Sequence, residues 1–227
     1  MDFKLIIQSR YGSSRLPGKV LFPLAGMPLL VFLIRRLKRF GFSKQLILAT
    51  TRNTEDDAVA AWGESENIPV VRGEAEDVLS RFLRCVDRYP ADFVLRITAD
   101  NPLTDPLLVE KTIQAMRTGQ WDYVQAFEGR PVGTGVDGFS SAMLRRISQR
   151  PLEPRHREHI NAYPLDNEHE FRCLSIKAPE DTARPDVRLT VDTGLDWKRV
   201  KAVVDGEEDP TAISVSHAVE RFDSLAF

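Results

Sequence analysis

Residues 4–19 read Lys4-Leu5-Ile6-Ile7-Gln8-Ser9-Arg10-Tyr11-Gly12-Ser13-Ser14-Arg15-Leu16-Pro17-Gly18-Lys19. The apolar run over residues 4–8 predicts a buried β-strand. The stretch after it combines small residues, which let backbone N–H groups approach phosphate oxygens, with the cations Arg10, Arg15 and Lys19. It is neither a Walker loop nor a GxGxxG loop. The alternative is a surface turn with incidental charge, but a phosphate-binding loop at the carboxyl end of a strand is typical of open α/β sheets.

Strand and helix alternate from this loop through residue 117. Strands are predicted over residues 45–50, 69–72 and 93–98, and helices over residues 29–40, 53–66, 77–89 and 105–117. Pro28 suits the first turn of the first helix and Gly41 suits its end. The alternation predicts a three-layer α/β/α fold with a mostly parallel sheet.

The pattern weakens beyond Trp121. Short strands are predicted over residues 123–127, 136–139, 171–176 and 187–191, and helices over residues 140–149, 153–162, 195–204 and 211–222. The chain shows no internal repeat and no linker long enough to separate two domains. We therefore expect residues 1–227 to form a single domain.

Composition excludes several classes of protein. No apolar run reaches the roughly 18 residues that a membrane span needs, and the first residues do not resemble a signal peptide. Cys85 and Cys173 stand far apart, which fits a reducing compartment, so we expect a cytoplasmic protein. The net charge is only −2, yet residues 1–52 hold ten Lys or Arg against the single acid Asp2. Because three of these cations lie in the loop, we expect a polyphosphate ligand and no nucleic acid.

Two aspartates each follow an apolar run. Asp100 comes after the predicted strand over residues 93–98, and Asp192 comes after the one over residues 187–191. Both are expected at the same sheet edge as the first loop, where carboxylate oxygens suit Mg²⁺. The alternative is that Asp100 stabilises a turn and that Asp192 caps the helix after it.

The motifs together resemble those of a known family. The pattern Arg-x-x-Ser-x-Arg-Leu-Pro-Gly-Lys over residues 10–19 is similar to the signature of sugar-acid cytidylyltransferases, such as the CMP-KDO and CMP-sialate synthetases. Further motifs follow in the order seen in the spore-coat polysaccharide biosynthesis protein F group: Asp56-Asp57 and residues 72–81, 96–103, 157–159 and 188–193. One departure is Gly194-Leu195-Asp196, where the group usually has Pro-Glu-Asp. The resemblance implies a nucleotide-diphospho-sugar transferase fold of the glycosyltransferase-A type, with Mg²⁺ as cofactor.

The residue roles are assigned on the motifs and this resemblance together. Nucleotide binding is predicted for Arg10, Tyr11, Gly12, Ser13, Ser14, Arg15, Lys19, Asp77, Arg81 and Thr98. Catalysis is predicted for Arg10, Arg15, Lys19 and Asp100, and metal binding for Asp100 and Asp192. Lys19 and Arg15 are both expected to face solvent. Asp77 and Arg81 lie four residues apart on one helix face, so a simple ion pair between them is an equal alternative to nucleotide binding.

The acceptor is predicted to contact Asp137, Arg157 and His159. Arg157 and His159 suit a carboxylate or phosphate, although the two residues could also be a polar helix face. Residues 121–165 are thus expected to form an acceptor-site subregion of the nucleotidyltransferase domain, and the place where a homodimer would form.

These assignments predict transfer of CMP from CTP to a small acidic sugar, with release of pyrophosphate, in surface polysaccharide or glycoconjugate biosynthesis. Three alternatives stay open: a nucleotidyltransferase that uses another NTP or a phosphorylated or phosphonate acceptor, a glycosyltransferase that uses a nucleotide sugar, and a non-catalytic nucleotide-binding protein. A glycosyltransferase normally needs Asp-x-Asp, which does not occur at Asp100.

Overall fold

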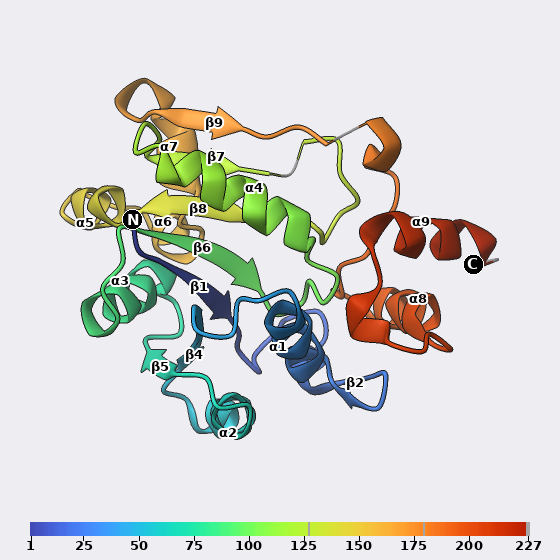
Figure 1. Cartoon of the computed structure of the whole chain (residues 1–227). Coiled ribbons are helices and arrows are strands. Elements are labelled where there is room, and N and C mark those ends of the chain that lie inside the picture. The colour runs from blue at the N-terminus through green and yellow to red at the C-terminus, as the bar shows by residue number, and fades with distance from the viewer. Residues whose placement is uncertain (127, 179, 226–227) are drawn as a thin grey trace.

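The computed structural model describes residues 1–126, 128–178 and 180–225. Its centre is a seven-stranded sheet in the order β5-β4-β1-β6-β8-β7-β9 (Figure 1). The strands are β1 (Phe3–Gln8), β4 (Leu46–Thr51), β5 (Val70–Gly73), β6 (Phe93–Thr98), β7 (Tyr123–Gln125), β8 (Asp137–Ser140) and β9 (Cys173–Ser175). The pairings β5–β4, β4–β1 and β1–β6 are parallel, whereas β8 runs antiparallel to both β6 and β7.

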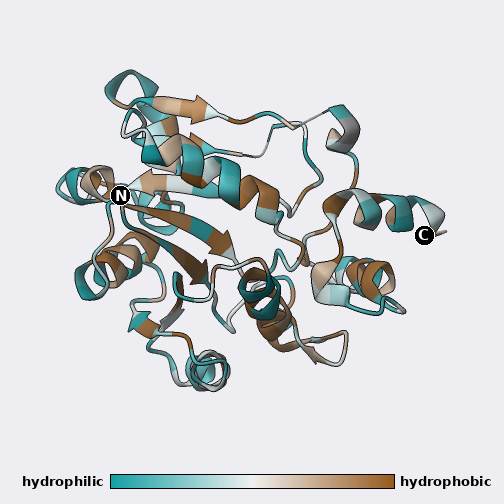
Figure 2. Ribbon diagram, in the orientation of Figure 1, coloured by the Kyte–Doolittle hydropathy of each residue, from teal (hydrophilic) through white to brown (hydrophobic). Residues whose placement is uncertain are grey.

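Helices cover both faces of this sheet. α1 (Leu29–Arg39), α2 (Asp57–Ser65) and α4 (Pro106–Arg117) contribute to one apolar cluster with alternate residues of β1 and β6, such as Leu5, Ile7 and Leu95. α3 (Val78–Arg88) and α5 (Ser141–Ser148) contribute to a second cluster on the opposite face, with Ile6 and Val94. Figure 2 shows the apolar strands enclosed between helices that are polar on the outside. The period-two alternation of the strands thus fills both interfaces.

The C-terminal helices form a third cluster beyond the carboxyl ends of the parallel strands. α8 (Gly194–Val204) and α9 (Val215–Ser224) pack against a small hairpin of β2 (Pro23–Leu24) and β3 (Met27–Pro28). Trp197 donates a hydrogen bond to the Pro23 carbonyl at 3.0 Å, and its ring meets Phe22 edge to face. The end of the chain therefore lies against the segment that follows the first loop.

Several predicted elements differ in the structure. Residues 187–191 form no strand, only a bridge between Val132 and Arg188. Their apolar alternation has another cause, because Val187, Leu189 and Val191 are all buried in the third cluster. The predicted strand over residues 123–127 ends at Gln125, and residue 127 lies outside the described residues.

Two predicted helices are broken. The helix over residues 153–162 divides into α6 (Pro154–Glu158) and α7 (Ala162–Asp166), because His159 leaves the helical region with φ −112° and ψ 84°. The helix over residues 211–222 divides into a 3-10 turn, Pro210–Ala212, and α9, which is capped by Ser214. That residues 1–227 form one nucleotidyltransferase domain stays a prediction. Among the described helices, none is both long and apolar enough to cross a membrane.

Candidate active site

The loop after β1 is held in one conformation by contacts at both ends. The Tyr11 backbone N–H donates to Asp56, a fully buried carboxylate that also accepts from the Thr51 hydroxyl. Gly18 donates to the Tyr11 carbonyl at 2.9 Å and closes the loop. Gly18 has φ +73°, and a Cβ there would lie 2.9 Å from the Tyr11 ring, so the closure requires glycine.

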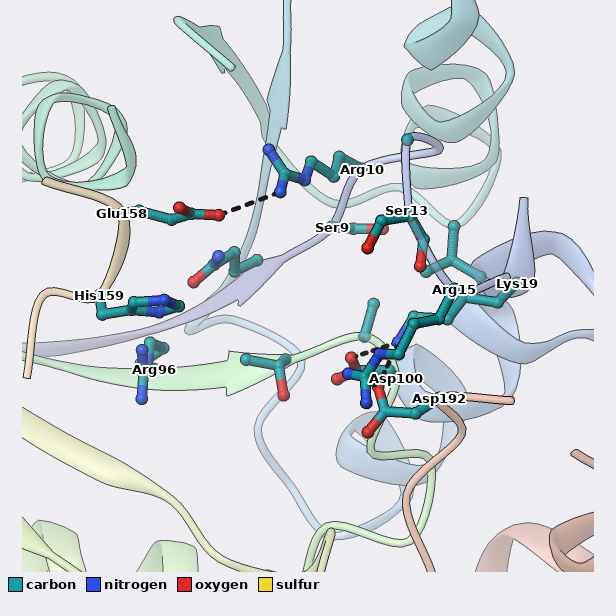
Figure 3. Close-up of a pocket in the computed structure, with 16 residues that line it drawn as sticks. Ser9, Arg10, Ser13, Arg15, Lys19, Arg96, Asp100, Glu158, His159 and Asp192 are labelled. Carbon is teal, nitrogen blue, oxygen red and sulfur yellow. Dashed lines mark hydrogen bonds and ion pairs between the residues drawn. The ribbon is translucent and has the colours of Figure 1, made fainter. Parts of the chain in front are cut away.

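This loop forms one wall of a cavity of about 310 Å³ at the carboxyl ends of β1 and β6 (Figure 3). The cavity is lined by Gln8, Ser9, Arg10, Gly12, Ser13, Ser14, Arg15, Lys19, Val20, Arg96, Thr98, Ala99, Asp100, Glu158, His159 and Asp192. Tyr11 is absent from this wall because its ring packs over Gly18.

One end of the cavity holds two carboxylates around one ammonium group. Lys19 Nζ lies 2.7 Å from Asp100 Oδ2 and 2.9 Å from Asp192 Oδ1. Arg15 contacts the same Asp192 oxygen at 2.7 Å, and Arg188 pairs with the other one. The structure therefore brings Arg15, Lys19 and Asp100, which were predicted for catalysis, together with the predicted metal ligand Asp192. Arg10, which was also predicted for catalysis, lies toward the other end of the cavity. Lys19 does not face solvent as expected, since its side chain is only 9% exposed, whereas that of Arg15 is 62% exposed.

Asp192 is oriented by residues of the turn into α8. One oxygen of Asp196 accepts hydrogen bonds from the Asp192 and Thr193 backbone N–H groups at 3.1 and 2.9 Å, and the other accepts from Arg188 at 3.0 Å. Burial acts to raise the pKa of Asp192, but the hydrogen bond and charge of Lys19, with the charges of Arg15 and Arg188, lower that pKa overall. Asp192 is thus kept ionised. The helix cap is supplied by Thr193, not by Asp192.

The donors at this end fit Mg²⁺. Two carboxylates at one point are oxygen ligands of the kind that Mg²⁺ takes together with phosphate oxygens and water. The ammonium group of Lys19 between them shows that the geometry already accommodates a cation. Across the ranges that the structure describes, no group of three or more His, Cys, Asp or Glu side chains is arranged for a metal. Other ligands would therefore come from substrate and solvent, and the assignment of the metal to Asp100 and Asp192 stays a prediction.

The other end of the cavity is formed by β6 and the C-terminus of α6. Arg10 reaches across to Glu158 at 3.2 Å and also contacts Glu76 at 3.3 Å (Figure 3). His159 follows Glu158 and lies at the rim, near Arg96. Thr98 also lines the cavity and accepts a hydrogen bond from Asn101 at 2.9 Å.

Asp137 does not lie on the cavity wall, which corrects its predicted placement. It is directly opposite Arg96 in the β6–β8 register, and its side chain is only 1% exposed. One carboxylate oxygen accepts from Nε and Nη2 of Arg96, and the other accepts from the Tyr123 hydroxyl at 2.6 Å. Because its oxygens are bonded behind Arg96, Asp137 positions that arginine rather than facing a ligand.

Asp77, Arg81 and Arg157 also lie outside the main cavity. Asp77 caps α3 through the Ser80 backbone and pairs with Arg157 at 3.0 Å, not with Arg81. Arg81 is 1% exposed and donates to the carbonyls of Glu74 and Ala75, the loop that also contacts Arg10. Because Arg157 is paired with Asp77 outside the cavity, only His159 of the three predicted acceptor residues lines the cavity. The binding roles of these residues stay predictions.

Sequence reasoning missed Arg96, Glu158 and Asp196. Arg96 and Glu158 stand inside quoted motifs, and the clue to Arg96 was its position two residues before Thr98, which places both on one face of the strand. The only signal for Asp196 was that Gly194-Leu195-Asp196 keeps the aspartate of the Pro-Glu-Asp that the resembling group usually has at this place.

Comparison with known proteins identifies the family of the chain. The sequence pattern of a family described as cytidylyltransferase matches residues 5–193. The chain is 33% identical over 223 residues to the spore coat polysaccharide biosynthesis protein SpsF of Bacillus subtilis (strain 168), covering 96% of this chain and 92% of that protein. It is 27% identical over 236 residues to the 8-amino-3,8-dideoxy-manno-octulosonate cytidylyltransferase of Shewanella amazonensis, covering 92% and 93%.

The solved structures give the same result. A cytidylyltransferase from Leptospira borgpetersenii serovar Hardjo-bovis superposes with a TM-score of 0.93 at 25% identity, over 99% of this chain and 94% of that one. The predicted nucleotide-diphospho-sugar transferase fold is confirmed by such neighbours. These relationships show that the chain is an enzyme and that it belongs to the cytidylyltransferase family.

Proposed function

We propose that this enzyme transfers CMP from CTP to a hydroxyl group of a small acidic sugar and releases pyrophosphate, with Mg²⁺ as cofactor, in surface polysaccharide or glycoconjugate biosynthesis. The observation that carries the proposal is the polarity of one cavity. Asp100, Asp192 and Lys19 meet at one end, and Arg96 and His159 lie at the other (Figure 3). A cavity with two such ends suits two polar substrates that react between them.

The chain's own groups act by binding and orientation. Arg10 and Arg15 are paired with carboxylates in this structure, so they exchange those partners for phosphate oxygens when a triphosphate enters. The small residues Gly12, Ser13 and Ser14 allow backbone N–H groups to approach the same oxygens. Mg²⁺ held by Asp100 and Asp192 would supply charge neutralisation and orientation of phosphate oxygens.

The reaction itself is an in-line displacement. The acceptor hydroxyl oxygen bonds to the α-phosphorus, the bond to the bridging oxygen of the β-phosphate breaks, and the hydroxyl proton passes to solvent. Phosphoryl-type transfer asks the protein mainly for alignment and charge neutralisation. Lys19 is fixed by two carboxylates at the loop end, so its charge is in place before the leaving group forms.

A second cavity, of about 360 Å³, extends the first and suits the nucleoside. The two cavities share Arg10, Gly12, Ser13 and Ser14. Asn53, Glu55 and Glu76 add side-chain acceptors to its wall, and these suit the exocyclic amino group of cytosine.

The test is pyrophosphate release from each of four NTPs with a panel of sugar acids and phosphorylated acids, with Mg²⁺ and after chelation. We expect turnover with CTP, a sugar acid and Mg²⁺. Asp100→Asn should lower kcat by about 10²- to 10³-fold. Asp87→Asn makes the same change at an exposed ion pair on α3 and should leave turnover unchanged. The proposal would be refuted if wild-type protein released no pyrophosphate with any combination of NTP and acceptor. Full activity of Asp100→Asn would also refute it.

A cytoplasmic location and a homodimer through residues 121–165 also belong to this proposal. Both cysteines are free thiols, and Cys85 is buried, which supports a reducing compartment.

A further inference from the structure

Arg96 enters the cavity from a fixed position on the sheet. It lies on β6 two residues before Thr98, so the two side chains point to the same face, and both line the cavity. Figure 3 shows Arg96 beside His159 at the end away from Lys19. A ligand at this end would meet a guanidinium group and an imidazole ring.

The guanidinium group is held from behind. Nε and Nη2 of Arg96 both donate to one oxygen of Asp137, and the Tyr123 hydroxyl holds the other oxygen. Burial and the neighbouring Asp137 raise the pKa of Tyr123, so its hydroxyl remains a donor. Tyr123 is 0% exposed and Asp137 1% exposed, which means that the whole support is part of the core. Arg96 therefore does not need to be ordered by a ligand.

This support leaves Nη1 of Arg96 for a ligand. Within residues 1–126, 128–178 and 180–225, no hydrogen bond from Nη1 is present, although the side chain is only 13% exposed. Because Arg96 lines the cavity, this charged donor is open to an oxygen of a ligand that binds there. Glu158, the carboxylate at this end of the cavity, pairs with Arg10 in this structure and makes no ion pair with Arg96.

We infer that Arg96, with His159 beside it, binds the acid group of the acceptor, so that this enzyme selects acids over neutral sugars of the same shape. The inference rests on the proposed function, which supplies an acceptor at this end of the cavity. Charge-assisted hydrogen bonds from a planar guanidinium suit a carboxylate or phosphate. Arg157 does not meet the requirement, because it is paired with Asp77 outside the cavity.

The test compares an acid acceptor with its neutral carboxamide in wild-type protein and in Arg96→Lys. Lysine keeps the charge, but its single nitrogen is drawn to Asp137 and offers no second donor to the ligand. We expect kcat/KM for the acid to fall about 10- to 100-fold, that for the carboxamide to change little, and KM for CTP to stay unchanged. A purely structural role would lower kcat/KM for both acceptors equally.

Two further arginine variants make the comparison specific. Arg145→Lys changes an exposed arginine of α5 that pairs with Asp87, and it should match wild type. Arg157→Lys tests the other predicted arginine and should leave the preference for the acid intact. If Arg157→Lys removes that preference and Arg96→Lys keeps it, the inference is overturned.

Direct binding separates failure of this inference from failure of the proposed function. Calorimetric titration with 8-amino-3,8-dideoxy-manno-octulosonate, repeated with 3-deoxy-manno-octulosonate and sialate, needs no turnover. Binding to wild type that is lost in Arg96→Lys supports the inference even if no pyrophosphate is released. Equal binding to both proteins, or no binding of any of the three acids to wild type, overturns it.

Discussion

Lys19→Met would test whether the two carboxylates form a cation site. The Lys19 side chain is 9% exposed and contacts both Asp100 and Asp192. Removing one partner from a buried ion pair costs about 3–5 kcal/mol. Asp100 is 28% exposed and Asp192 keeps Arg15 and Arg188, so we expect a smaller loss in the free energy of unfolding, about 2 kcal/mol.

Magnesium should reverse part of this loss. Without the ammonium group, Asp100 and Asp192 repel each other, and a divalent cation between them relieves the repulsion. A ligand at ten times its Kd stabilises the folded state by about 1.4 kcal/mol. We therefore expect Mg²⁺ to stabilise Lys19→Met more than wild type, in which Lys19 competes for the same oxygens.

The assay is urea unfolding with and without Mg²⁺, with Arg15→Met as the matched variant. Arg15 contacts the same Asp192 oxygen, but its side chain is 62% exposed, so its loss should cost at most about 1 kcal/mol. If both variants have the same urea midpoint as wild type, the ion pairs of Lys19 do not stabilise the folded protein. If Mg²⁺ stabilises wild type and Lys19→Met equally, the carboxylate pair does not bind the metal in the way proposed.

Three further predictions concern other parts of the chain. Burial acts to raise the pKa of Asp196, but the Thr193 hydrogen bonds and the charge of Arg188 lower that pKa overall. The ionised carboxylate therefore stabilises the folded protein above the pKa that Asp196 has in the unfolded chain, and this stabilisation is lost as the pH falls through its pKa in the folded protein. In Asp196→Asn, the free energy of unfolding measured with urea should fall less between pH 7 and pH 3 than it does in wild type. An equal fall in both proteins would contradict this prediction. Burial raises the pKa of Cys85 to about 12, so this thiol should resist Ellman's reagent at pH 8 until the protein unfolds. Cys173 is only partly buried, so the measurement uses Cys173→Ser, and rapid labelling of that folded variant would refute the placement of Cys85. A homodimer should give twice the mass of 25.7 kDa by light scattering at micromolar concentration, whereas a monomer there would rule it out.

The parallel half of the fold could be predicted from sequence because its signals are local. β1 and β6 are apolar runs that pair directly, so the loop after β1 and Asp100 after β6 must lie at the same edge. Asp192 was placed at that edge for a partly wrong reason. The residues before it form no strand, but Val191 donates to the Asp100 carbonyl at 2.8 Å, which fixes Asp192 beside Asp100.

The proposed acceptor end could not be predicted as well because it depends on contacts between distant residues. Nothing local to Asp137 indicates that it faces Arg96, since that pairing comes from the antiparallel register of β6 and β8. Arg157 and His159 lie two residues apart, and residues at that spacing on a helix do not share a face, so which of them meets the cavity depends on how α6 packs. Arg157 lies within α6 and pairs with Asp77 outside the cavity, whereas His159 follows the end of α6 and lines the cavity.

The two ends of the cavity are therefore built by different kinds of structure, and this bears on how the enzyme tells its substrates apart. The loop that we propose for the triphosphate carries the cations Arg15, at the Lys19 end, and Arg10, which reaches toward the other end, and each is paired with a carboxylate that it can exchange. At the other end, Arg96 is hydrogen-bonded to buried Asp137, which Tyr123 holds in turn, and Arg96 has no comparable freedom.

A site whose groups can change partners suits a flexible triphosphate that loses two of its phosphates during the reaction. A site fixed in the core suits discrimination, because a rigid donor is left unpaired by a wrong ligand and cannot move to recover the loss. On this reasoning, substitutions in the loop should act mainly on nucleotide binding and turnover, and substitutions around Arg96 mainly on the choice of acceptor.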